Sequence, residues 1–243
     1  MGTGPRAAVY LDRFVPGRPA PFATADERPW KEAIAATLAS VQPADGGTFL
    51  ELDFAVAPAI GYARGADLDN FCEPVFSVLA NRLGWFGKRR PNVLAFRSRK
   101  KVAEPTGCRI RITDELWEDA WISGPVLLAG VWAGPLPLSA RDAGFADWVA
   151  QAMIRAASPS AVLGVELRFA GPVNLGDIAT GRLKNVIDCL HPVLGGRPGA
   201  PDDARIVVLE AARMDPEVKG TVRVRVVELT EERVGSHSTG GHQ

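Results

Sequence analysis

The feature of this chain that most constrains its fold is an internal repeat. Segment 54–79, FAVAPAIGYARGADLDNFCEPVFSVL, aligns without a gap on segment 169–194, FAGPVNLGDIATGRLKNVIDCLHPVL. The identical pairs, all at a constant offset of 115, include Phe54 with Phe169, Gly61 with Gly176, Leu68 with Leu183, Asn70 with Asn185, and Leu79 with Leu194. A repeat of this kind predicts two copies of one unit, packed about an approximate two-fold axis.

The same order of elements is expected in each half. A helix follows Trp30 and Trp148, and alternating strands are predicted at 50–54, 93–99 and 109–112, and again at 165–169, 206–211 and 222–227. The predicted fold class is α+β, with two strand–helix–strand–helix–strand–strand units related by a pseudo-two-fold. We place the units at 1–116 and 117–234, with the boundary in the acidic stretch 113–123 and a disordered tail at 235–243.

Composition excludes several classes of protein. With 243 residues, 47% hydrophobic and 23% charged, the chain is not of the disordered class and is long enough to bury a core. Its apolar runs fall short of the roughly 20 residues that a membrane helix needs, and we expect no membrane partner. The N-terminus carries no visible export signal, and the three cysteines (Cys72, Cys108 and Cys189) form no CxxC pair, so a cytoplasmic location is expected.

The sequence lacks the residue patterns of several common kinds of catalytic site. His191 is the only histidine outside the expected tail, so no Ser–His–Asp or Cys–His arrangement is recognisable, and clustered zinc ligands are absent from the sequence. The glycine-rich segment 195–201 is not followed by the GK[ST] of a phosphate-binding loop. We interpret it as a loop that delivers Asp202 and Asp203.

The candidate chemistry begins at Asp67-Leu68-Asp69-Asn70, where a Gly/Ala-rich loop meets a predicted helix. Asn70 is expected to cap that helix. Two carboxylates at i and i+2 beside a helix N-terminus can converge on one Mg²⁺ ion, and Glu73 lies one turn beyond Asp69. The alternative is a pair of solvated acids that stabilise the helix dipole.

The order of these motifs resembles the RusA family of Holliday junction resolvases, whose pattern is D-x-D-N, a helix with D-x-L, and D-D-x-x-[IV] before a strand. The first half matches at Asp67, Asp69, Asn70 and Leu79. The second half matches at Asn185, the run 188–190 (DCL), Leu194, Gly195, Gly196, Asp202, Asp203 and Ile206. The resemblance implies a Mg²⁺-dependent endonuclease of DNA recombination and repair that binds branched DNA. Family members are homodimers in which three aspartates of one subunit hold the metal, so this chain would be a fused, single-chain pseudo-dimer.

Each half departs from that pattern. The first has Asp67 and Asp69 but carries Lys88-Arg89-Arg90 in place of Asp-Asp, and the second has Asp202 and Asp203 but carries Arg182 and Lys184 in place of D-x-D. In one interpretation each metal site has become an ion pair, with Asp67 and Asp69 facing Arg90, and Arg182 and Lys184 facing Asp203.

In the other interpretation, Asp67 and Asp69 meet Asp203 across the pseudo-two-fold and form one composite site. Glu73 and Asp188 stand where the family tends to place a lysine, and they can rebuild a metal shell as Asp67–Asp69–Glu73 or Asp188–Asp203. We favour loss or strong weakening of catalysis, and both interpretations stay open.

A strongly basic stretch lies at 82–111, where ten basic residues stand against Glu104 in a chain of zero net charge. Arg97, Arg99 and Lys101 share one strand face, and Arg109 and Arg111 are expected on the neighbouring strand. With Lys88, Arg89 and Arg90 they form the candidate nucleic-acid surface. Trp85-Phe86 is either a base-stacking pair or the closure of a hydrophobic loop.

Three functions follow from these patterns. The first is a RusA-like Mg²⁺-dependent endonuclease acting on branched or structured DNA, or a weakened descendant of one, with Asp67, Asp69 and Asp203 as catalytic residues. The second is an inactive DNA-binding or scaffolding protein with ion-paired sites and no cofactor. The third is a module for protein–protein contact.

Overall fold

The computed structural model describes residues 8–43, 48–58, 66–87, 92–115, 117, 120–171, 173–214 and 221–229. Three of the predicted nucleic-acid residues, Lys88, Arg89 and Arg90, lie outside these ranges, as does the predicted tail. The fold is α+β. No helix among the described residues is long and apolar enough to cross a membrane.

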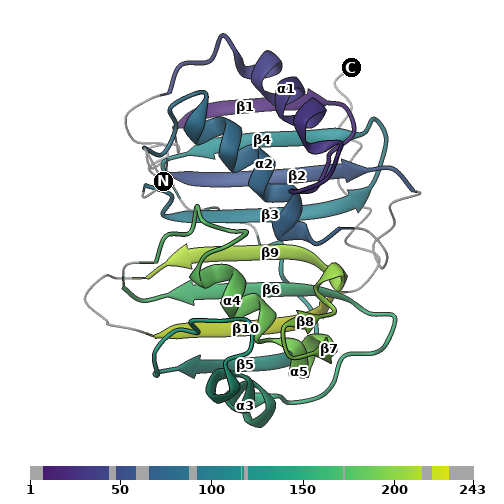
Figure 1. The fold of residues 1–243 in the computed structure, drawn as a ribbon, viewed down its shortest axis with the longest axis vertical. Coiled ribbons are helices and arrows are strands. Elements are labelled where there is room, and N and C mark those ends of the chain that lie inside the picture. The colour runs from purple at the N-terminus through teal and green to yellow at the C-terminus, as the bar shows by residue number, and fades with distance from the viewer. Residues whose placement is uncertain are drawn as a thin grey trace, which may run out of the picture.

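A mixed eight-stranded sheet runs the length of the molecule in the order β1-β4-β2-β3-β9-β6-β10-β5 (Figure 1). Its strands are β1 (Val9–Pro16), β2 (Phe49–Val56), β3 (Ala95–Val102), β4 (Gly107–Thr113), β5 (Val126–Trp132), β6 (Val162–Phe169), β9 (Ile206–Arg213) and β10 (Val222–Leu229). All six strands placed from the alternating pattern are confirmed. The segment expected as a loop contains a short hairpin, β7 (Gly196–Arg197) and β8 (Ala200–Pro201).

The strand pairings are the same on both sides of the sheet's midline. In the first half β2 pairs in parallel with β3 and antiparallel with β4, and β4 pairs with β1. In the second half β6 pairs in parallel with β9 and antiparallel with β10, and β10 pairs with β5. The antiparallel pair β3–β9 joins the halves. Counted from either edge to the centre, the strands therefore follow one another with the same pairing directions.

The helices lie on one face of this sheet (Figure 1): α1 (Glu27–Leu38), α2 (Leu68–Asn81), α3 (Ala143–Ala152), α4 (Arg182–Asp188) and α5 (His191–Leu194). Apolar residues at alternate strand positions face them. Phe54 of β2 contacts Phe71 of α2 with ring centroids 5.6 Å apart, and Phe76 of α2 meets Phe96 of β3 edge-on at 5.4 Å. One buried hydrophobic cluster runs continuously through both halves, so the two halves share a core.

The start of α2 differs from the prediction. Asp67, not Asn70, occupies the N-cap position, and Asn70 lies inside the first turn with its amide donating to Asp67 Oδ2 at 3.1 Å. Pro74 lies further inside the helix and has no N–H for the carbonyl of Asn70. That carbonyl instead accepts the backbone N–H of Phe22 at 2.8 Å, which ties the segment before α1 to the start of α2.

The opposite face of the sheet carries the segment that connects the halves. Trp121 and Ile122 of this segment pack on Val208 and Val227, in a small apolar cluster separate from the main core. The segment lies between β4 and β5, where the unit boundary was predicted.

Candidate metal centre

Three carboxylates from both halves of the chain converge at the midline of the sheet. Asp67, Asp69 and Asp203 each offer one carboxylate oxygen, and these oxygens all lie within 4.8 Å of one another. Asp69 and Asp203 are buried, and Asp67 is half-buried. The structure therefore brings together the three aspartates of the predicted composite site.

The first turn of α2 and a 3₁₀ turn before β9 position these side chains. Asp67 and Asp69 lie at the N-terminus of α2, where the helix dipole favours negative charge. Asp203 opens a 3₁₀ turn, Asp203–Arg205, directly before β9. Because β9 lies beside β3, that turn comes next to the start of α2 although 134 residues separate Asp69 from Asp203. Arg205 fixes the turn from behind by donating to the carbonyls of Ala161 and Leu194.

A lysine of the second half lies among the carboxylates. Lys184 Nζ is 2.9 Å from Asp69 Oδ2, 2.9 Å from Asp203 Oδ2 and 3.1 Å from Asp188 Oδ1. The predicted pairing of Lys184 with Asp203 is thus present, and Lys184 also reaches across to Asp69. Arg182, expected to face Asp203 as well, instead donates to the carbonyls of Leu136 and Pro137.

The electrostatics of the centre are set by burial and by mutual repulsion. Burial, together with Asp203 and Asp69, raises the pKa of Asp67 to about 7. Burial also raises the pKa of Asp69, against the lowering influence of Lys184. Burial alone would lower the pKa of Lys184, but Asp69, Asp203 and Asp188 raise it above its ordinary value. The surroundings thus favour the charged form of Lys184 and the protonated form of Asp67.

A second lysine, and a fully buried one, borders the centre from β3. Lys100 is 1% exposed, and its Nζ donates to the carbonyls of Ala66 at 3.1 Å and Ala204 at 2.7 Å. Burial lowers the pKa of Lys100 to about 8, although the three aspartates act in the opposite direction. Lys100 is one of the ten basic residues of 82–111 but does not belong to the predicted site. The available signal was its strand position, because strand alternation puts residue 100 on the face opposite 97, 99 and 101.

The other predicted metal ligands lie outside the three-carboxylate cluster. Asp188 is engaged by Lys184, and Asp202 is half exposed with Arg205 Nε 4.0 Å away. Glu73 is on the second turn of α2 and is not one of the three clustered acids. The carboxylates that the fold brings within 4.8 Å of one another therefore differ from both alternative shells, Asp67–Asp69–Glu73 and Asp188–Asp203.

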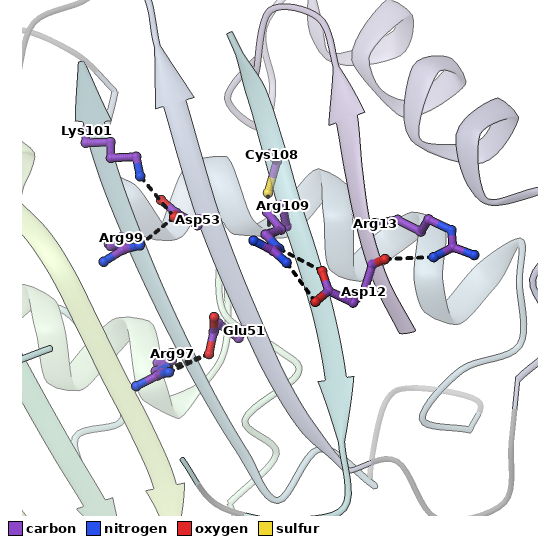
Figure 2. A network of polar contacts seen from close by, with 9 residues as sticks. All are labelled: Asp12, Arg13, Glu51, Asp53, Arg97, Arg99, Lys101, Cys108 and Arg109. Carbon is purple, nitrogen blue, oxygen red and sulfur yellow. Dashed lines mark hydrogen bonds and ion pairs between the residues drawn. The ribbon is translucent and has the colours of Figure 1, made fainter. Parts of the chain in front are cut away.

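The predicted basic face has a different layout from the one expected. Strand β4 is not beside β3, because β2 lies between them and places Glu51 and Asp53 among the arginines. The basic side chains have acidic partners on neighbouring strands (Figure 2): Arg97 pairs with Glu51 at 2.5 Å, Arg99 and Lys101 with Asp53 at 2.6 and 3.2 Å, and Arg109 with Asp12 at 2.7 Å. Arg111 lies in register with Glu51 and Asp12.

Aromatic residues cover part of that face. The Trp121 ring stacks on the guanidinium groups of Arg97 and Arg99, with centroid distances of 4.0 and 4.2 Å, and Trp117 lies 4.9 Å from Arg97. Arg97 is 2% exposed. Much of the positive charge predicted to follow a phosphate backbone is thus neutralised within the sheet, a result that local sequence counting misses.

Two further sequence candidates are buried. Trp85 and Phe86 are 1% and 5% exposed and pack in the main core, so they close a hydrophobic loop and do not present a base-stacking surface. Cys72, Cys108 and Cys189 are unpaired and buried, as expected for cysteines outside a disulfide framework.

The donor set fits a hard divalent cation. Oxygens in one octahedral Mg²⁺ shell lie about 3.0 Å apart when adjacent and about 4.2 Å apart when opposite, so carboxylates within 4.8 Å of one another need to draw closer to share one ion. Four carboxylates and two ammonium groups meet here, which leaves a formal charge of −2. Buried Asp69 Oδ2 has the Lys184 ion pair but accepts no hydrogen bond of good direction. These features match the charge and ligand preference of Mg²⁺.

No family model and no curated protein matches this chain. Among solved structures, a cyanuric acid hydrolase from A. caulinodans is similar over 94% of this chain and 73% of its own, with 14% sequence identity and a TM-score of 0.28. A similarity at this TM-score carries no argument about the function of this chain.

Proposed function

We propose that this chain is a RusA-like nucleic-acid protein, a single-chain pseudo-dimer with one composite Mg²⁺ centre that hydrolyses phosphodiester bonds in branched DNA. The observation that carries the proposal is the cluster of Asp67, Asp69 and Asp203, with carboxylate oxygens within 4.8 Å although they come from different halves. Carboxylate clusters of this density are what a phosphodiesterase needs to hold a divalent cation.

The register of the central strands supports the duplication. The repeat offset maps Phe49 of β2 on Gly164 of β6. Their parallel partners, Ala95 of β3 and Val208 of β9, are therefore counterparts as well. Two positions further along these strands, Arg97 corresponds to Glu210, and these two residues are directly paired between β3 and β9. A position on a two-fold axis pairs with its own counterpart, so this pairing is consistent with an axis that relates the two halves.

That axis also explains the composition of the centre. Asp69 and Lys184 are counterparts in the repeat, and they contact each other at 2.9 Å. Asp67 corresponds to Arg182, so the two related positions now have opposite charge. A duplicated chain can specialise in this way, because each half is free to change separately.

In the proposed mechanism Asp67, Asp69 and Asp203 hold the cation. Bound Mg²⁺ would supply Lewis acidity toward a phosphate oxygen and lower the pKa of a water. Because a ligand carboxylate must be ionised, protonation of Asp67, whose pKa is raised to about 7, would compete with binding of the cation. Lys184 Nζ must move away from Asp69 and Asp203 or remain as a counter-charge beside the phosphate.

A second candidate function has its own supporting observation. Lys184 lies 2.9 Å from both Asp69 and Asp203, so it already neutralises part of the centre. The partners of Arg97, Arg99, Lys101 and Arg109 likewise reduce the charge available to DNA. Both facts favour a pseudo-nuclease that binds or scaffolds, with ion pairs in place of metal.

Metal binding by Lys184→Met separates the two functions. Removing an ammonium that competes for the carboxylates is expected to tighten Mn²⁺ binding about tenfold or more in calorimetry, since 1.4 kcal/mol is tenfold and one neighbouring charge contributes about that much. Lys101→Met, which removes a lysine on the opposite face of β3, should leave the affinity unchanged. Absence of Mn²⁺ binding in both wild type and Lys184→Met favours the pseudo-nuclease.

Cleavage of a four-way DNA junction with Mg²⁺ tests the activity directly. Wild type is expected to cut and Asp69→Asn to lose at least 100-fold in rate, while both bind the junction in a salt-sensitive manner. Equal cleavage by both proteins would reject the composite centre. Lack of any DNA binding would leave the protein–protein module as the remaining function.

A further inference from the structure

Lys100 joins the two halves of the chain at the centre through backbone atoms. Its side chain leaves β3 on the helix-covered face and is 1% exposed. Its Nζ donates to the carbonyl of Ala66, in the first half, at 3.1 Å and to the carbonyl of Ala204, in the second half, at 2.7 Å. Burying an ammonium is costly unless its hydrogen bonds are well made, so these two contacts are a specific feature of the fold.

Each carbonyl lies next to a carboxylate of the centre. Ala66 directly precedes Asp67 at the N-cap of α2, and Ala204 directly follows Asp203 in the 3₁₀ turn. A single nitrogen bonded to both carbonyls fixes the separation of the two backbone segments. That separation in turn fixes how closely Asp67 and Asp203 approach each other.

The second lysine at the centre makes a different kind of contact. Among the residues that the structure describes, Lys184 contacts side-chain oxygens, those of Asp69, Asp188 and Asp203. It neutralises charge but holds no backbone atom in these contacts. The two lysines therefore resemble each other in charge and differ in what they hold in place.

We propose that Lys100 is the positioning residue that assembles the composite carboxylate centre from its two halves. The part of this proposal that concerns metal rests on the proposed function, whereas the fixing of the two backbone segments does not.

The direction of the effect on cation binding distinguishes positioning from charge. If Lys100 acted only as a nearby positive charge, Lys100→Met would tighten cation binding, as removal of Lys184 should. If Lys100 sets the approach of Asp67 to Asp203, the same substitution weakens binding because the carboxylates separate. Two lysine-to-methionine changes at one centre are thus expected to have opposite signs.

Mn²⁺ titration followed by electron paramagnetic resonance measures this sign. We expect Lys100→Met to weaken Mn²⁺ binding at least tenfold and Lys184→Met to tighten it. The matched control is Lys101→Met, which removes the neighbouring lysine bound to Asp53 on the other sheet face and should leave the affinity unchanged. Tighter or unchanged binding in Lys100→Met overturns the proposal.

Hydrogen exchange without metal tests the positioning role independently. In Lys100→Met, amides of 66–70 and of 202–206 should exchange at least tenfold faster together, while those of β10 stay protected and Lys101→Met resembles wild type. Unchanged exchange in either segment overturns the proposal, even if no variant binds Mn²⁺ and the proposed function fails. If Lys100→Met does not fold, Lys100→Gln, whose amide can keep one donation, should give intermediate exchange, and wild-type exchange there overturns it equally.

Discussion

Asp67 is the carboxylate of the centre whose pKa is raised into the neutral range. Its pKa is raised from an ordinary 3.8 to about 7, first by burial and then by repulsion from Asp203 and Asp69. Between these two values the folded chain binds more protons than the unfolded chain. The contribution of Asp67 to stability is therefore fully present below about pH 4 and is lost as the pH rises through 7.

Asp67→Asn should remove this pH dependence. In EDTA the wild-type melting temperature is expected to fall between pH 5 and pH 8, and the variant should melt roughly 3–6 °C higher than wild type at pH 8 with a flatter profile. Thermal unfolding followed by circular dichroism measures both quantities. Asp202→Asn, a change at the half-exposed carboxylate directly before Asp203, serves as the control. Parallel pH profiles for wild type and Asp67→Asn would contradict the assignment.

At the level of elements, the β7–β8 hairpin controls where Asp203 lies. Gly196 has φ +87°, and a Cβ there would lie 2.5 Å from the carbonyl oxygen of Ala200 and 2.8 Å from the amide nitrogen of Asp202. Gly199, at φ +75°, would place its Cβ 2.8 Å from the side chain of Arg141, which is flexible and can move. The two glycines have similar backbone strain but different neighbours.

Gly196→Ala should therefore disturb the centre more than Gly199→Ala. Both variants are expected to lose stability by about 1 kcal/mol from the left-handed backbone, with a further loss for Gly196→Ala because backbone must shift. Urea unfolding gives the stabilities, and Mn²⁺ affinity should fall only in Gly196→Ala. An equal loss of affinity in both variants would show that the hairpin does not position Asp203.

The elements were largely predictable, but their neighbours were not. Period-two alternation located β4 and β10 because one face of each is apolar. The sequence contains no local signal that β4 pairs with β2 and not with β3, since that choice depends on the whole sheet. For the same reason, counting charges along 82–111 could not reveal that Glu51 and Asp53 lie among the arginines.

At the level of the whole molecule, the centre depends on both halves at once. Asp67→Asn and Asp203→Asn are expected to weaken Mn²⁺ binding strongly as single changes, and the double variant should bind little worse than the poorer single variant. Such non-additivity, with a coupling of roughly 1–3 kcal/mol, is expected for ligands of one ion. Calorimetric titration of the four proteins measures it, and additive losses would indicate two separate sites.

Sequence comparison of the halves suggested this composite centre without deciding it. The distribution of Asp67, Asp69 and Asp203 allowed either ion pairs within each half or one shared cluster. The antiparallel pairing of β3 with β9, which local sequence does not reveal, brings the two half-sites together. The contacts of Lys100 could not be predicted, because they are made to backbone carbonyl groups, which the sequence does not distinguish.

The β3–β9 ladder has a consequence for how the molecule behaves in a mixture. Where two separate chains build a centre together, dilution takes it apart, and a defective chain can inactivate a sound one by pairing with it. Here the paired strands belong to one polypeptide, so Asp67 meets Asp203 at a fixed effective concentration. The centre therefore stays assembled at any concentration at which the chain stays folded. A copy with a damaged half cannot inactivate an intact copy by exchanging partners across this ladder.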